Sequence, residues 1–367
     1  MLVRVTFLVA PFKRHMIQRM ASDFSPRLVY NIVSTRYPAP ASEWRKMRFI
    51  ERLDEKFFGG SSIRELVRRF DPDLVYSDSP LYSSQFKLAS LVSRKRPLVL
   101  HLRGDLWREH TAVFTSSSIR KRVLFMQQSM YDWTAVALAT EITPICRWLE
   151  TVVQHHVPRK RCEVVYQGVD PEQFKPQGGF EVQKPAIAIV QNHSILPKVQ
   201  GLLNFRAVME RVPQTHFYIA EGEAWAQQFL NLVKKHFAGL RNVHFVSGIT
   251  NPTAVAKMLT ACDCYVLASG LDCCPTTVLE ASLLERPVLA SRVGGVPEII
   301  EDGYTGWSIN NSNINEWVSK LLLLRQDDKL RRQLGRQGRT WVSEKFGWNR
   351  ISSQVQQLII REVERNH

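Results

Sequence analysis

Short apolar runs of strand length recur along the chain and alternate with segments in which apolar residues return every three or four positions. A short apolar run is typical of a strand buried in a sheet, whereas the longer spacing is typical of a helix with one apolar face. Their alternation predicts an α/β protein with parallel sheets. The predicted strands are Val3–Ala10, Leu74–Tyr76, Pro97–Leu102, Glu141–Pro144, Ala186–Val190, His216–Ala220, Asn242–Val246, Cys264–Ala268 and Pro287–Ala290.

The pattern becomes helical from Ile314 to the end of the chain, with one interruption at 346–348, where the sequence reads Phe-Gly-Trp. The length of 367 residues predicts two domains. Pro176, Gly178 and Gly179, with polar residues around them, form the best candidate for an interdomain linker. The predicted apolar faces are Trp317, Leu321 and Leu324 before the interruption, and Ile351, Val355, Leu358 and Ile359 after it.

One amphipathic segment, 44–57, combines aromatic and basic residues. Its apolar positions are Trp44, Met47, Ile50, Leu53 and Phe57, with Arg and Lys between them. Such a helix can lie at the surface of an anionic membrane, but by base rates a helix packed on its own sheet is the more common explanation. A second basic cluster, 120–122, begins another predicted helix.

The formal net charge is +15, and it is concentrated in the first half of the chain. Residues up to Asp170 include 27 basic and 16 acidic side chains, against 22 and 18 in the remainder. A basic half of this kind attracts phosphates, an anionic membrane or another polyanion. Nucleic acid is not expected as a partner, because no binding motif of that kind is present and the basic residues are scattered.

The six cysteines have spacings that match neither a zinc site nor a small disulfide framework. Reduced thiols in a cytosol are therefore expected. No apolar run reaches the roughly 18 residues of a membrane-spanning helix, and Val3–Ala10 is too short for a signal peptide. These features predict a cytoplasmic protein, with attachment to the cytoplasmic face of a membrane left open.

The stretch 261–310 carries the most specific chemistry. A strand, a loop and the start of a helix are predicted here, with Asp272 on the loop and Glu280 about one turn into the helix. Both carboxylates can then face the space beyond the strand end. Backbone N–H groups near the helix start, around 274–277, would point into the same space, where a helix N-terminus attracts phosphate.

Four sub-motifs occur in order here: Asp272 with Glu280, then 286–291 (RPVLAS), 294–298 (GGVPE) and 302–306 (DGYTG). Together they resemble the donor-site signature of the retaining glycosyltransferases of family 4, which have the GT-B fold. The segment 163–170 (EVVYQGVD) resembles the end of that family's first domain. The resemblance covers the C-terminal two thirds and is weaker before His101.

The resemblance implies two Rossmann-like domains facing one another across a cleft. An acceptor domain is expected at 1–172, completed by a C-terminal helix at 348–367, and a donor domain at 173–347. Asp272 would hold the donor sugar and Glu280 the ribose hydroxyls. Arg103 and Asp105, which follow a strand end, are acceptor-side catalytic candidates, with an intradomain ion pair as the alternative. The full set of implied donor-binding residues is Asn192, His193, Lys198, Gly248, Cys273, Cys274, Pro275, Thr276, Thr277 and Glu280.

The chain departs from the family pattern at several positions. Asp272 stands where Glu is usual, and the loop at 11–15 lacks the usual Gly-Gly pair, with Lys13 or Arg14 as candidate substitutes for its role at the phosphates. The usual Arg before Lys198 falls on Asn192 or His193. Loss of this cation should weaken phosphate binding or let a neutral imidazole donate instead.

The implied reaction is transfer of a sugar, with retention, from a nucleotide-diphosphate sugar to a lipid-linked, glycan or other anionic acceptor. No cofactor is expected, and no divalent metal. Two alternatives share the fold: a nucleotide-sugar epimerase and a non-catalytic sugar-nucleotide-binding protein. The sequence does not determine the sugar, the base, the acceptor or the oligomeric state.

Overall fold

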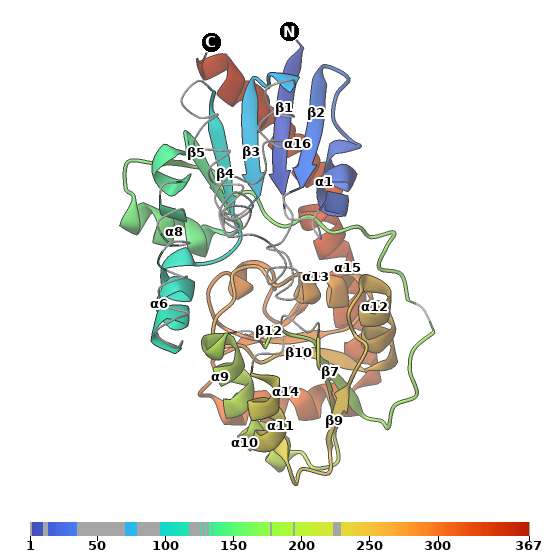
Figure 1. The fold of residues 1–367 in the computed structure, drawn as a ribbon. Coiled ribbons are helices and arrows are strands. Elements are labelled where there is room, and N and C mark those ends of the chain that lie inside the picture. The colour runs from blue at the N-terminus through green and yellow to red at the C-terminus, as the bar shows by residue number, and fades with distance from the viewer. Residues whose placement is uncertain are drawn as a thin grey trace, which may run out of the picture. The chain divides into compact units, whose positions relative to one another are not determined.

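The chain folds into two compact units, seen in a computed structural model (Figure 1). The first unit comprises Met1–Tyr166 and Trp348–His367, and the second comprises Gln167–Gly347. The boundary predicted from the sequence, after residue 172, lies a few residues further along the chain. The structure describes residues 2–9, 14–34, 70–78, 96–116, 126, 129, 132–133, 135–176, 178–193, 195–222 and 229–366.

A parallel six-stranded sheet forms the first unit, with the strand order β2-β1-β3-β4-β5-β6. All five positions of β3, and all five of β4, are buried, as expected for strands covered on both faces. The chain leaves β1 on one side to form β2 and returns to the other side for β3. The strands are β1 (Val3–Val9), β2 (Leu28–Ser34), β3 (Leu74–Asp78), β4 (Leu98–Leu102), β5 (Glu141–Pro144) and β6 (Arg161–Cys162).

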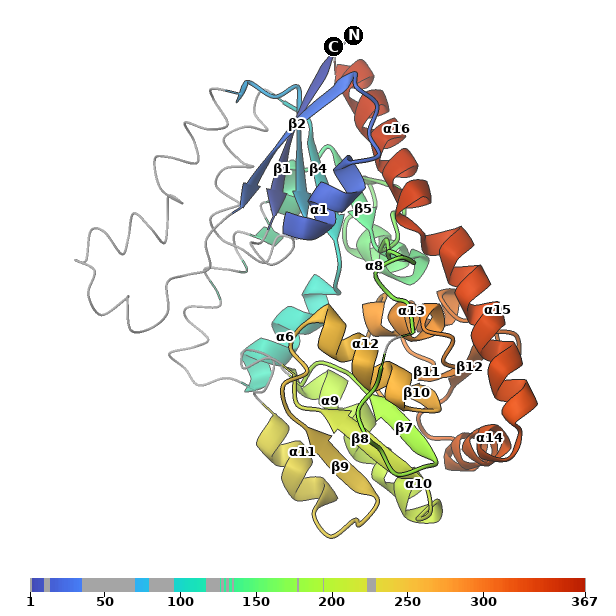
Figure 2. The same ribbon diagram turned by 90° about the vertical axis from the view of Figure 1, so that its right-hand side faces the viewer.

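Helix α16 (Trp348–Asn366) joins the end of the chain to the first unit. Its apolar face, which includes Ile351, Val355 and Leu358, packs with Val5 and other residues of β1 and β3 in one buried cluster. Helix α1 (Arg14–Ala21) lies beside α16, as Figure 2 shows. The other described helices of this unit are α6 (Leu106–Ser116) and α8 (Arg147–His156).

A buried carboxylate pair also ties α16 to the sheet. Glu362 of α16 is fully buried and accepts from Arg161 at 2.7 Å and Arg365 at 2.9 Å. Glu141, at the start of β5, is buried beside it and lies 3.4 Å from Arg361. Burial, together with a hydrogen bond to Glu362, raises the pKa of Glu141 to about 7. Below that pH Glu141 is largely protonated and can donate a hydrogen bond to Glu362.

The second unit is built on another parallel six-stranded sheet, with the order β12-β11-β10-β7-β8-β9. The chain forms β7, β8 and β9 in one direction, then returns to the other side of β7 for β10, β11 and β12. The strands are β7 (Ala186–Ile189), β8 (His216–Ala220), β9 (Val243–Val246), β10 (Cys264–Leu267), β11 (Val288–Ser291) and β12 (Gly306–Ile309).

Trp317 is the largest fully buried side chain of the second unit. It makes an edge contact with Phe205 at 5.0 Å between ring centroids and belongs to a cluster with Phe217 and Leu321. The helices that supply and cover this core are α9 (Leu196–Asn204), α10 (Arg206–Arg211), α11 (Leu230–Phe237), α12 (Pro252–Ala261), α13 (Thr276–Leu283), α14 (Ile314–Gln326) and α15 (Asp328–Phe346).

Every strand predicted from the sequence is present, with ends that differ by a residue or two. The interruption at 346–348 is also confirmed: α15 ends at Phe346 and α16 begins at Trp348. The prediction missed β2, β6 and β12. Pro176, Gly178 and Gly179, expected to link two domains, belong instead to the second unit, where a Cβ on Gly179 would come within 2.9 Å of Ala261. The segments 44–57 and 120–122 and Lys13 lie outside the described residues.

Candidate donor site

The strand order of the second sheet places its ligand crevice between β7 and β10. Connections leave these neighbouring strands in opposite directions, and in open α/β sheets ligands bind beyond the carboxyl ends of such strands. The loop after β7 leads through Asn192 and His193 to α9, and the loop after β10 leads through Asp272 to α13. Both candidate segments therefore meet at one place, although about eighty residues separate them in the sequence.

Two glycines allow α9 to approach the loop after β10. A Cβ on Gly201 would lie 2.3 Å from the carbonyl carbon of Ser269, and one on Gly270 would lie 2.3 Å from the carbonyl oxygen of Pro197. Neither position has room for a larger side chain without backbone movement. This close packing brings the first turn of α9, which carries Lys198, against the loop that carries Asp272.

Lys198 and Asp272 form an ion pair across the crevice. Their Nζ and Oδ1 atoms are 3.6 Å apart, and both side chains keep a minor part of their surface exposed, 21% and 14% respectively. The structure thus brings together a cation and a carboxylate that the sequence placed in separate motifs. A lysine side chain that keeps part of its surface exposed can meet an anion that enters the crevice.

The N-terminus of α13 presents backbone donors to the same crevice. Its N-cap, Pro275, makes no side-chain capping bond and has no N–H of its own. The amide of Val278 donates to the carbonyl of Pro275 at 3.1 Å. For the amides of Thr276 and Thr277, no acceptor is found within the part of the chain that the structure describes. These two N–H groups and the helix dipole favour an anionic ligand.

Tyr265 ties the two sides of the crevice together. It is a fully buried residue of β10, and its hydroxyl donates to the carbonyl of Val190, directly after β7, at 2.9 Å. The same hydroxyl is 2.7 Å from Oγ1 of Thr277. Burial raises the pKa of Tyr265, and the negative charges of Asp272 and Glu280 raise it further. Both carboxylates therefore lie near this hydroxyl, which stays protonated.

Glu280 lies one turn beyond Thr277 on α13, so the two side chains share a face of the helix. The residue is half-buried, and burial of its carboxyl raises its pKa to about 7. A carboxyl with this pKa ionises within the physiological range. It can accept hydrogen bonds from hydroxyl groups when ionised and donate one when protonated.

His193 is fully buried in the loop after β7. Within the described part of the chain neither ring nitrogen has a well-formed hydrogen bond. Burial lowers its pKa to about 4, against a smaller opposing effect of the Glu221 backbone. The ring is therefore neutral near pH 7, so it does not replace the charge of an arginine. Its neighbour Asn192 is half-buried.

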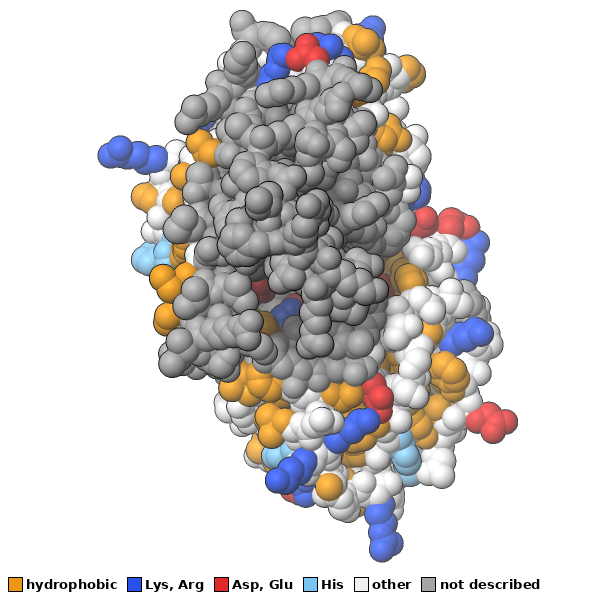
Figure 3. Space-filling model, viewed as in Figure 1, with side chains coloured by type: hydrophobic (Ala, Val, Ile, Leu, Met, Phe, Trp, Pro, Cys, Tyr) orange, Lys and Arg blue, Asp and Glu red, His pale blue; other side chains and the backbone are white. Residues whose placement is uncertain are grey.

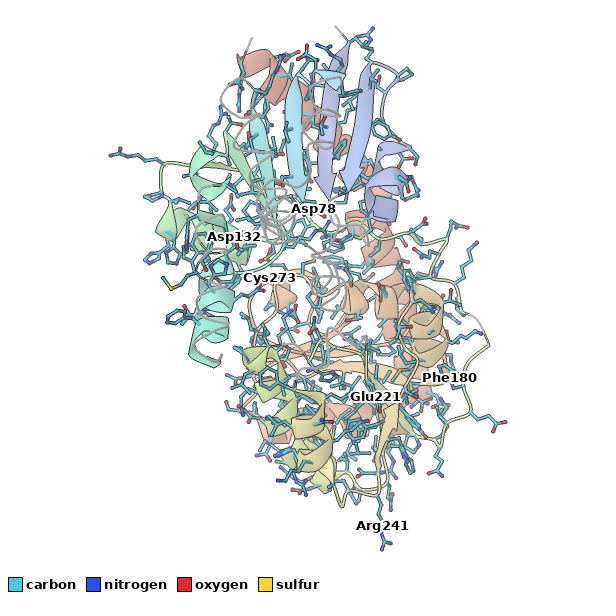
Figure 4. All side chains as sticks on the ribbon, in the orientation of Figure 1. Asp78, Asp132, Phe180, Glu221, Arg241 and Cys273 are labelled. Atoms are coloured by element: carbon cyan, nitrogen blue, oxygen red, sulfur yellow. The ribbon has the colours of Figure 1, made fainter. Side chains whose placement is uncertain are left out.

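The remaining donor-site candidates have more ordinary surroundings. Gly248 is exposed and adopts a positive φ of 77° after β9, with nothing within 4 Å of where a Cβ would lie. Cys273 and Cys274 are buried in the loop before α13, and Figure 4 marks Cys273 there. No disulfide bond joins any of the six cysteines, all of which lie within the described residues.

The first-unit candidates are both engaged in local structure. Arg103 donates to the buried Asp78 at the end of β3, at 2.5 Å (Figure 4). Asp105 is buried just before α6, accepts from the amide of Arg108 at 3.0 Å and thus caps this helix. These contacts match the alternative of intradomain pairing. A catalytic role for Arg103 and Asp105 stays a prediction.

Several site residues escaped the sequence analysis. The sequence shows Tyr265 only as part of an apolar strand, and nothing in it indicates that the hydroxyl reaches Val190. Asp78 lies beyond the predicted end of its strand. Gly201 and Gly270 are ordinary glycines until α9 is packed on the loop. Within the described ranges, no group of three or more His, Cys, Asp or Glu side chains is placed to hold a metal ion.

Comparison with known proteins divides the chain into two matched regions. Residues 172–341 match the sequence model described as glycosyl transferases group 1, and residues 4–173 match the one described as glycosyltransferase family 4. One curated relative is the sulfoquinovosyl transferase SQD2 of Arabidopsis thaliana, 22% identical over 303 residues. The match includes 79% of this chain but only 56% of that relative.

Two solved structures share the whole fold. Sucrose-phosphate synthase from Thermosynechococcus elongatus superposes with a TM-score of 0.74 at 14% identity and covers 100% of both chains. HepE from Anabaena, solved in complex with UDP-glucose, superposes with a TM-score of 0.70 at 15% identity and covers 98% of this chain and 100% of its own. At these identities the similarity shows the fold, and it agrees with the predicted GT-B architecture of two Rossmann-like units.

Proposed function

Because the chain belongs to the group 1 glycosyltransferases of the GT-B type, we propose that it transfers a sugar from a nucleotide-diphosphate sugar to an acceptor. The observation that carries this proposal is the convergence of Lys198, Asp272 and the amide N-terminus of α13 at the β7/β10 crevice. HepE, which shares the fold, has been solved with UDP-glucose, a ligand of the proposed class.

The groups at the crevice suit the charges of such a donor. Breaking a sugar-phosphate bond leaves a diphosphate that gains negative charge and a sugar carbon that gains positive charge. Lys198 and the amides of Thr276 and Thr277 would stabilise the diphosphate. Asp272, 3.6 Å from Lys198, would bind the sugar hydroxyls next to it. Glu280 would accept from the ribose.

We propose further that the reaction is metal-independent and retains the configuration of the sugar. One lysine and two helix amides can neutralise much of a diphosphate's charge without a divalent cation. Retention follows from the family resemblance of the donor motifs. If leaving phosphate helps to deprotonate the acceptor, the enzyme needs no separate general base.

For the acceptor we propose a lipid-linked, glycan or other anionic molecule, bound by the first unit. The net charge of +15 favours an anionic partner. Arg103, at the end of β4, keeps 17% of its side chain exposed and would contribute positive charge there. The SQD2 relative is named for transfer of a sulfoquinovosyl group.

Peripheral contact with an anionic membrane is also proposed. It rests on the basic first half of the chain and on the segment 44–57, which lies outside the described residues. On the face of the second unit visible in Figure 3, Lys and Arg side chains stand singly among other types and form no patch. None of the described helices is long and apolar enough to cross a bilayer. Flotation with neutral and anionic vesicles tests the proposal, and equal recovery with both would refute it.

The test of donor use is a panel of nucleotide sugars, measured by thermal stabilisation and by slow hydrolysis. A donor present at a hundred times its dissociation constant should add about 2.7 kcal/mol to the free energy of unfolding. We expect one donor to stabilise the wild type, Glu280→Ala to lose this shift and Asp272→Ala to lose hydrolysis. If no nucleotide sugar binds, the proposed function is wrong, and a product isomerised without acceptor would indicate an epimerase instead.

A further inference from the structure

The hydroxyl of Tyr265 fixes the direction in which the hydroxyl of Thr277 can bond. A tyrosine hydroxyl has a single hydrogen, and the carbonyl of Val190, 2.9 Å away, can only accept. Tyr265 therefore donates to Val190. In its second contact, 2.7 Å from Oγ1 of Thr277, it must accept. The hydrogen of the Thr277 hydroxyl is thus committed to Tyr265.

Because its hydrogen bonds to Tyr265, the hydroxyl oxygen of Thr277 can only accept a hydrogen bond from a ligand. The residue is half-buried, so part of its surface is accessible from the solvent side. A phosphate oxygen has no hydrogen to offer, and placing it against Oγ1 would oppose two acceptors. A ligand hydroxyl, in contrast, can donate to this oxygen. The backbone amide of Thr277 remains a donor, so one residue offers a phosphate-binding group and a hydroxyl-binding group.

Glu280 supplies a second acceptor on the same face of α13. Residues three apart on a helix are neighbours, with Cβ atoms roughly 5–6 Å apart. An ionised Glu280 accepts from hydroxyls as Thr277 does. Two acceptors at this spacing, next to a diphosphate-binding helix end, match two adjacent hydroxyls on a ring attached to that diphosphate.

We propose that Thr277, oriented by Tyr265, accepts a hydrogen bond from a ribose hydroxyl and so selects ribonucleotides over nucleotides that lack these hydroxyls. Tyr265 is a positioning residue, since its own hydroxyl bonds to Val190 and Thr277. The inference rests on the proposed function, because it concerns the nucleotide part of the same donor. It adds a role in specificity for the side chain of Thr277, whereas the family resemblance implies a role only for its backbone amide.

The experiment compares UDP, GDP, ADP and CDP with their 2′,3′-dideoxy forms by titration calorimetry. Variants are Thr277→Val, which removes only the oxygen, Thr277→Ser, which keeps it, and Tyr265→Phe. Thr260→Val is the matched control, since it makes the same change of side chain on α12, which supplies none of the crevice groups described above. The readout is the ratio of affinities for the ribo and dideoxy forms within each variant, which a general loss of stability does not change.

We expect Thr277→Val and Tyr265→Phe to weaken binding of the ribo form by about three- to tenfold and that of the dideoxy form by less than about twofold. Thr277→Ser and Thr260→Val should keep the wild-type ratio. Equal losses for both forms, or a larger loss for the dideoxy form, would overturn this assignment while leaving the proposed function intact. Failure of every diphosphate to bind the wild type would overturn both.

Discussion

Glu280 should make donor binding depend on pH in a predictable direction. With a pKa of about 7 in the ligand-free protein, its carboxyl is about one-tenth ionised at pH 6 and about nine-tenths ionised at pH 8. In the proposed complex the ribose hydroxyls would donate to the ionised form, so binding would shift the carboxyl toward ionisation and release a proton. Donor affinity should therefore rise about tenfold from pH 6 to pH 8, equivalent to about 1.4 kcal/mol.

Other groups of the crevice do not account for such a change. The pKa of His193 is lowered to about 4, below this range, and the pKa of Tyr265 is raised away from it. The assay is calorimetric titration of a nucleotide sugar, whose diphosphate diester does not titrate here, in buffers of different ionisation enthalpy. Glu280→Gln serves as the control and should flatten the profile. A flat profile in the wild type, or an unchanged slope in Glu280→Gln, would refute the reasoning.

Three further predictions concern stability. Because the pKa of Glu141 is raised on folding, its contribution to the free energy of unfolding is lost as pH rises from about 4.5 to about 7. Glu141→Gln should reduce this loss of stability, measured by urea unfolding across that range. Asp105→Ala should lower the free energy of unfolding by about 1 kcal/mol, because it removes the cap of α6, whereas Asp105→Asn should keep the stability. If Asp105→Asn also keeps kcat, a catalytic role of Asp105 is excluded. Gly201→Ala should destabilise by about 1–3 kcal/mol because its Cβ would meet the backbone of Ser269, and Gly178→Ala, with open space around it, should be nearly neutral; equal midpoints in thermal unfolding would contradict this.

The strands were predictable because burial on both faces leaves a local trace. Strand β10 reads as a continuous apolar run, and its four residues are all buried. The sequence does not predict strand β2 (Leu28–Ser34), since Asn31 and Ser34 interrupt its apolar run. Among the described strands it lies at the edge of the sheet and pairs only with β1. The donor motif was found because its residues are close in sequence, from Asp272 to Glu280.

Contacts between segments that are distant in sequence produce no local pattern of this kind. Nothing near Asp105 in the sequence distinguishes a helix cap from a catalytic carboxylate, and the structure shows the cap. The ion pair of Lys198 with Asp272 depends on the tight contact of Gly201 with Ser269, which arises only when α9 packs on the loop after β10.

The sequence by itself determined the α/β alternation, the helical end of the chain and the residue types of the donor motifs, because burial and helix period act over a few neighbouring residues. Only the tertiary structure decided what those residues can do. The order of strands placed β7 beside β10, and this let one buried hydroxyl, on Tyr265, bond to Val190 and Thr277 together. Burial likewise set the pKa of Glu280 near 7 and kept His193 neutral. Hydrogen-bond direction and ionisation depend on the groups that surround a side chain in space, and these come from parts of the chain that are far apart in sequence.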